Sequence, residues 1–97
     1  MAKVKEERPG TGYYKFFCPG CKREHIFWTN RDRGQSFCWH FNNDLEKPTV
    51  RASILNDPVE AIGYKRCHLF ITDGKIQYLG DCGHELAGKT VDMVDVE

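Results

Sequence analysis

The side chains of this sequence that could do chemistry are mainly thiols and imidazoles in three short motifs. Two thiols lie two residues apart in Cys18-Pro19-Gly20-Cys21, on a tight Pro-Gly turn that directs both sulfurs the same way. This spacing supplies half of a tetrahedral zinc site, which needs two more nitrogen or sulfur ligands. Cys67-His68 and Asp81-Cys82-Gly83-His84, near the other end of the chain, can supply them. The sequence therefore predicts a bound Zn²⁺ ion.

A hairpin predicted at Asp73-Gly74 decides which of these residues approach the zinc. An Asp-Gly pair between two runs rich in β-branched and aromatic residues is a strong signal of a two-residue turn. In the register that follows, Cys82 is the diagonal neighbour of Cys67, within roughly 7 Å. The predicted ligands are Cys18, Cys21, Cys67 and Cys82, with His84 or His25 as alternates to Cys82.

The sequence holds more candidate ligands than one closed site needs, with five cysteines and four histidines. A zinc ion with three protein ligands and a water would activate that water for hydrolysis. In that case His84, Asp81 and His68 are the candidate catalytic residues, because a base can stand beside the metal-bound water. Cys38 is expected to be a bystander on the polar face of its strand.

Short segments rich in aromatic and β-branched residues, punctuated by Gly and Pro, make up most of the chain. The segments expected to form strands are residues 13–17, 25–29, 36–41, 49–55, 67–72, 75–79 and 90–96. Residues 30–34 are expected to form a polar turn. The sequence therefore predicts a mainly β fold, a small antiparallel β-sandwich or rolled sheet with a zinc-knuckle hairpin. We expect a flexible leader over residues 1–10 and one zinc-binding domain over residues 11–97.

Charge and cysteine content limit the classes of function. Basic and acidic residues number 14 each, and a net charge of +0 argues against a protein that coats nucleic acid. The charged N-terminus has no apolar signal segment, and no apolar run approaches the roughly 20 residues that cross a membrane. We therefore expect a cytoplasmic protein with reduced thiols and no membrane contact.

Several blocks of the sequence resemble a family of small uncharacterised proteins from phages and bacterial genomes, some of which carry the label ammonia monooxygenase. The blocks are residues 18–21 with His25, then 39–42, 45–49, 53–55, 67–70, 73–76 and 79–91. The polar members of this pattern are Asn42, Thr49, Ser53, Asp81 and His84. They are expected either to line a small pocket beside the zinc or to satisfy buried backbone groups. The resemblance implies no established activity, and a phage origin would place the protein in the host cytoplasm, in host takeover or anti-defence.

Three functions follow, in order of preference. The first is a non-catalytic β domain with a structural zinc that binds a protein partner. The second is a zinc-dependent hydrolase with an open metal site. The third is a nucleic-acid-binding module that uses the basic N-terminal third and Trp28.

Overall fold

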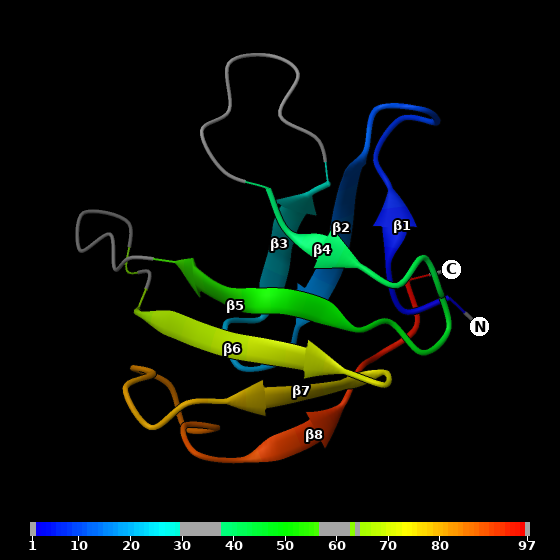
Figure 1. Cartoon of the computed structure of the whole chain (residues 1–97). Coiled ribbons are helices and arrows are strands. Elements are labelled where there is room, and N and C mark those ends of the chain that lie inside the picture. The colour runs from blue at the N-terminus through cyan, green and yellow to red at the C-terminus, as the bar shows by residue number, and fades with distance from the viewer. Residues whose placement is uncertain (1, 30–37, 57–62, 64, 97) are drawn as a thin grey trace.

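The computed structural model describes residues 2–29, 38–56, 63 and 65–96, whose strands form two antiparallel sheets (Figure 1). The strands are β1 (Lys5–Glu6), β2 (Tyr13–Cys18), β3 (Arg23–Trp28), β4 (His40–Phe41), β5 (Val50–Asn56), β6 (Cys67–Thr72), β7 (Lys75–Tyr78) and β8 (Thr90–Asp92). One sheet has the order β1-β2-β3 and the other β4-β5-β6-β7-β8. The predicted mainly β fold class is confirmed.

Alternating burial along the strands builds one core between the two sheets. Every second residue of β6 from Cys67 to Ile71 is buried, which is the period of a strand with one face on a core. The ring of Phe41 on β4 lies edge-on to Tyr14 and Phe27 of the three-stranded sheet, with ring centres 4.9 and 5.5 Å apart. The inner faces of the two sheets therefore share their hydrophobic side chains.

The hairpin between β6 and β7 has the predicted register. Thr72 pairs with Lys75 and Leu69 pairs with Tyr78. The turn residues Asp73 and Gly74 both have positive φ values, 50° and 79°, as a two-residue hairpin turn requires.

Strand β7 ends at Tyr78, earlier than the sequence predicts, although the Leu79 N–H still donates to the His68 carbonyl oxygen at 2.9 Å. The Cys82 N–H donates to the carbonyl oxygen of Leu79 at 3.2 Å, so the chain turns there instead of continuing as a strand. Because of this turn, Cys82 does not occupy the diagonal position beside Cys67 that the extended register predicts.

Other predicted strand boundaries also differ from the observed ones. Of the predicted strand 36–41, only His40–Phe41 pairs in the sheet, and residues 36–37 and the predicted turn at 30–34 lie outside the described residues. The predicted strand 90–96 is observed as Thr90–Asp92. The domain boundary after residue 10 stays a prediction, although Lys5–Glu6 forms β1 and Val4 lies in the core. Among the described residues, no helix has the length and apolar character needed to cross a membrane.

Candidate metal centre and candidate active site

The turn between β2 and β3 presents two thiols to the space between the sheets. Cys18 is the last residue of β2 and is fully buried, while Cys21 is half-buried in the turn. The Lys22 N–H donates to the Cys18 carbonyl oxygen at 2.7 Å and closes the turn, with Lys22 at a φ of 59°. The backbone N–H of Cys21 points at the Cys18 sulfur, 3.3 Å away. This is the predicted knuckle.

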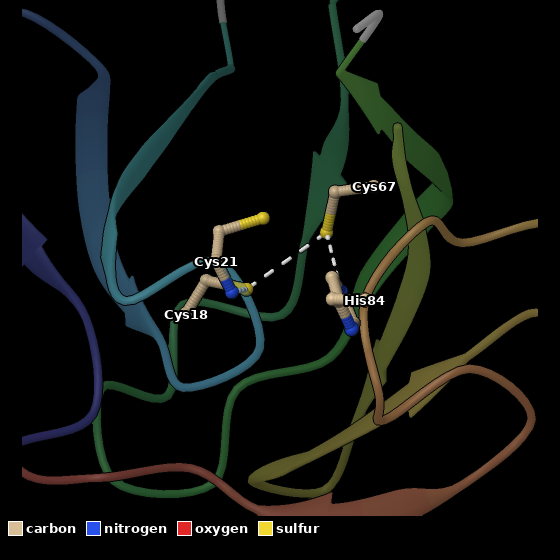
Figure 2. Close-up of side chains that lie close together, drawn as sticks. All are labelled: Cys18, Cys21, Cys67 and His84. Carbon is tan, nitrogen blue, oxygen red and sulfur yellow. Dashed lines mark hydrogen bonds between the residues drawn. The ribbon is translucent and has the colours of Figure 1, made fainter. Parts of the chain in front are cut away.

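Cys67 of the five-stranded sheet and His84 of the β7–β8 connection supply the other half of the cluster (Figure 2). Cys67 opens β6, and its Sγ lies 3.8 Å from the Sγ of Cys18 and 3.5 Å from Nε2 of His84. The ligand atoms of Cys18, Cys21, Cys67 and His84 all lie within 4.8 Å of one another. These four residues are therefore close enough to bind one metal ion.

His84 is held in place by its packing. Its ring stands edge-on to Tyr78, with centres 4.6 Å apart, and its Nδ1 accepts from the Leu86 N–H at 3.2 Å. A Cβ on Gly20 would lie 2.3 Å from Cε1 of His84. The glycine of the knuckle is thus what allows the imidazole to approach the thiols.

The cluster favours negative charge on one sulfur. The Cys67 thiol donates to the Cys18 sulfur and is the main cause that lowers the pKa of Cys18 to about 3. The same hydrogen bond raises the pKa of Cys67, and burial raises that of Cys21. The Tyr78 hydroxyl lies 3.0 Å from the Cys18 sulfur. Thiolate is the form in which cysteine binds metals.

The remaining predicted ligands lie outside this group. Cys82, a first-choice ligand, instead contacts the backbone of His68: its sulfur is 3.3 Å from the His68 N–H and 3.1 Å from the His68 carbonyl oxygen. The alternate His25 is buried, and among the described residues both of its ring nitrogens lack a hydrogen-bond partner, but it is not one of the four clustered ligands. Cys38 is also not among the four clustered residues.

A second constellation lies on the opposite face of β6. Nε2 of His68 is 3.0 Å from Oγ of Ser53, and Nδ1 of His68 is 3.1 and 3.3 Å from the two carboxylate oxygens of Asp81. A serine hydroxyl, an imidazole and a carboxylate in one hydrogen-bonded chain form the geometry of a Ser-His-Asp triad. The hydrogen bond from His68 lowers the pKa of Asp81, and so does Arg66, whose Nε donates to Asp81 at 3.0 Å.

An irregularity in β5 positions the serine. Val50 pairs with Ile71 and Ile54 pairs with Leu69, so four steps along β5 match two steps along β6. The extra residues form a bulge that contains Ser53, and bulges commonly re-aim a side chain next to an active site. The indole Nε1 of Trp39 donates to the Ser53 carbonyl oxygen at 3.1 Å and holds the bulge from the β4 side.

The sequence predicts His68 and Asp81 as catalytic residues beside an open metal, and it predicts no catalytic role for Ser53. The third residue predicted beside that metal, His84, lies with the thiols instead. Ser53 was only a polar member of the family pattern. No local motif marks Ser53, because its hydroxyl meets His68 only through the pairing of β5 with β6.

Comparisons with known proteins place the chain in a family. Searches of the curated proteins and of the solved structures found no match. A family model described as bacterial ubiquitination-like system serine protease (BubE) matches residues 2–79, which include Ser53 and His68 and end before Asp81 and His84. The match confirms that the chain resembles a bacterial family. The description of that family carries no ammonia monooxygenase label. The chain belongs to the BubE family.

Proposed function

We propose that this protein is a serine hydrolase that cleaves acyl bonds in polypeptides, with Ser53 as nucleophile. The observation that carries the proposal is the continuous hydrogen-bonded chain from Ser53 through His68 to Asp81. The family description, which names a serine protease, supports it independently. The protein partner expected from the sequence is, in this proposal, the substrate.

In this proposal each residue of the chain has a role. Nε2 of His68 takes the proton of the Ser53 hydroxyl as its oxygen attacks the substrate carbonyl carbon. When the bond to the leaving group breaks, His68 returns that proton to the leaving nitrogen or oxygen, and an acyl-Ser53 ester remains. Water then hydrolyses this ester with His68 again as base. Asp81 holds the Nδ1–H of His68 and stabilises the imidazolium.

The metal in this proposal is a structural zinc held by Cys18, Cys21, Cys67 and His84. Around a tetrahedral zinc with Zn–S of about 2.3 Å and Zn–N of about 2.05 Å, two sulfurs are about 3.8 Å apart and sulfur and nitrogen about 3.5 Å apart. The observed separations, 3.8 Å between Cys18 and Cys67 and 3.5 Å between Cys67 and His84, match both values. Four protein ligands make a closed site, which disfavours the open zinc hydrolase expected as an alternative. Reduced thiolates also suit the cytoplasm.

The experiment is active-site labelling of the zinc-loaded protein with a fluorophosphonate probe. The adduct should map to Ser53 by mass spectrometry, and Ser53→Ala and His68→Ala should each abolish labelling. Ser36→Ala is the matched control, because Ser36 is the only other serine of the chain. In a peptidase assay Ser53→Ala should lower kcat by roughly 10⁴- to 10⁶-fold. Labelling of Ser36 alone, no labelling, or hydrolysis that survives in Ser53→Ala would contradict the proposal.

A further inference from the structure

The acid of the proposed triad lies in an exposed turn. Asp81 follows β7, and its side chain is 43% exposed. In the Ser-His-Asp triad of serine proteases the aspartate is buried, so water does not compete with the histidine for its carboxylate. Water reaches Asp81 in this structure, so a further contact is needed to keep its carboxylate turned toward His68.

The side chain of Arg66 supplies that contact. Its Nε donates to Oδ2 of Asp81 at 3.0 Å, and the same oxygen lies 3.1 Å from Nδ1 of His68. The other oxygen, Oδ1, is 3.3 Å from that Nδ1. Among the described residues, His68 and Arg66 are the side chains that bond this carboxylate. Rotation of the carboxylate away from His68 therefore also breaks its charge-assisted bond to Arg66.

The backbone of Arg66 holds the same turn against the start of β6. Its carbonyl oxygen accepts from the Gly83 N–H at 2.8 Å, and a Cβ on Gly83 would lie 2.9 Å from Cβ of Lys65. The turn is therefore packed closely on residues 65–66. A substitution of Arg66 removes only the contact of the side chain with Asp81, because the backbone bond to Gly83 does not depend on the side chain.

The charge of Arg66 opposes the proposed reaction, whereas its position favours it. The reaction places a positive charge on His68, and the positive charge of Arg66 lies on the other side of the Asp81 carboxylate. Loss of that charge by itself would stabilise the imidazolium and speed the attack by Ser53. Loss of the orientation of Asp81 would slow the attack. The two effects therefore have opposite signs in a variant without the guanidinium.

We propose that Arg66 is a positioning residue of the triad, which holds the Asp81 carboxylate against His68. This inference rests on the proposed function, because it takes Ser53 as the nucleophile and His68 as its base. The Arg66–Asp81 pair adds little to the stability of the fold, since its side chains are 41% and 43% exposed. Variants of Arg66 should therefore fold, bind zinc and keep Tm within about 4 °C.

The test measures how fast the fluorophosphonate probe modifies Ser53 in the zinc-loaded protein. The limiting rate of modification (kinact) reports the activation of Ser53, and the probe concentration at half that rate (KI) reports binding. Arg66→Met, which keeps an extended side chain without a charge, should lower kinact about tenfold and leave KI within about twofold. The loss should be smaller than that caused by removing the carboxylate, because Asp81 remains able to contact His68.

Chemical rescue distinguishes positioning from a general effect on the fold. Arg66→Ala leaves space for a small cation, so added guanidinium should restore at least about a third of the lost kinact, whereas sodium chloride at the same ionic strength should not. Guanidinium should not rescue the double variant Arg66→Ala, Asp81→Asn, which has no carboxylate for the cation to hold. Rescue of that double variant would overturn the proposal.

Lys65→Met is the matched control for the loss of one positive charge at this end of β6. Lys65 is exposed and is not among the described side chains that bond Asp81. Methionine keeps the Cβ that packs against Gly83. Lys65→Met should therefore leave kinact within about twofold of the unsubstituted protein. Equal losses in Lys65→Met and Arg66→Met would overturn the assignment to Arg66.

The remaining outcomes separate this inference from the proposed function. If the unsubstituted protein is not modified at Ser53, the hydrolase proposal itself fails. If Ser53 is modified and Arg66→Met reacts as fast as the unsubstituted protein or faster, Arg66 does not position Asp81 and the hydrolase proposal stands. A lower kinact with loss of zinc and without rescue by guanidinium would give Arg66 a structural role and also contradict the inference.

Discussion

Cys67 and His68 are consecutive residues of β6, and their side chains leave the strand on opposite faces. Cys67 meets the metal ligands and His68 meets Ser53 and Asp81. The residues after β7 are also shared between the two sites: Asp81 contacts His68, whereas His84 lies with the three thiols. Because the two groups of residues are neighbours in the chain, a metal bound by the cluster would position the proposed triad without taking part in its chemistry.

Asp81→Asn tests the role of the carboxylate. Asparagine keeps the size of the side chain but no longer stabilises the imidazolium, so kcat should fall roughly 10³- to 10⁴-fold with KM little changed. Steady-state peptidase kinetics measure kcat and KM separately. Asp92→Asn is the control, since Asp92 pairs with Lys75 on the exposed end of the sheet. Equal losses in both variants would point to a general effect on folding.

In the proposed hydrolase, Cys82 is a positioning residue. Its thiol contacts both the N–H and the carbonyl oxygen of His68, so Cys82→Ala should lower kcat about tenfold while Cys82→Ser, which keeps a donor and an acceptor, retains most of it. Zinc content should stay at one ion in both variants. Loss of zinc in Cys82→Ala would instead restore Cys82 as the fourth ligand that the sequence predicts.

At the scale of elements, two local irregularities position the chemistry. The bulge in β5 brings Ser53 to His68, and the knuckle turn between β2 and β3 brings two thiols toward Cys67. A regular β5 ladder would change the face or the height of the serine, because side chains alternate with a period of two. The regular strands hold the two candidate sites in place, and the bulge and the turn orient the side chains that form them.

Gly20→Ala tests the fit of the knuckle to His84. The new Cβ would lie 2.3 Å from the imidazole, so the ring must move and zinc affinity should fall about tenfold or more, measured by competition with a chelator. Gly80→Ala is the matched control, because a Cβ there meets no atom within 4 Å. Equal affinities in the two variants would show that His84 is not a ligand.

At the scale of the whole molecule, the metal cluster joins the two sheets. Cys18 ends β2 of the three-stranded sheet, whereas Cys67 begins β6 of the five-stranded sheet. A domain of 97 residues has a small core, so a metal bound between the sheets, as proposed, would add substantially to its stability.

Zinc removal should therefore destabilise the fold and the triad together. After treatment with a strong chelator, Tm should fall by at least about 15 °C, and peptidase activity should be lost. Added Zn²⁺ should restore both. Cd²⁺ or Co²⁺ should restore activity nearly as well, because the metal holds the fold and does not activate water. Activity that varies strongly with the metal while Tm stays constant would favour the open zinc site.

The sequence by itself determined the features that depend on neighbours in the chain. The Cys18–Cys21 spacing predicted the knuckle, and Asp73-Gly74 predicted the hairpin with its register. The strand pattern predicted a mainly β fold. Each of these rests on turn chemistry or side-chain alternation, which act over a few residues.

Only the tertiary structure brings together the residues of each candidate site. That His84 and not Cys82 lies with the three thiols depends on the end of β7 at Tyr78 and on the turn that follows. The meeting of Ser53 with His68 depends on a bulge in the pairing of β5 with β6. Where a ladder stops or slips is set by packing between residues far apart in sequence, and no single segment encodes it.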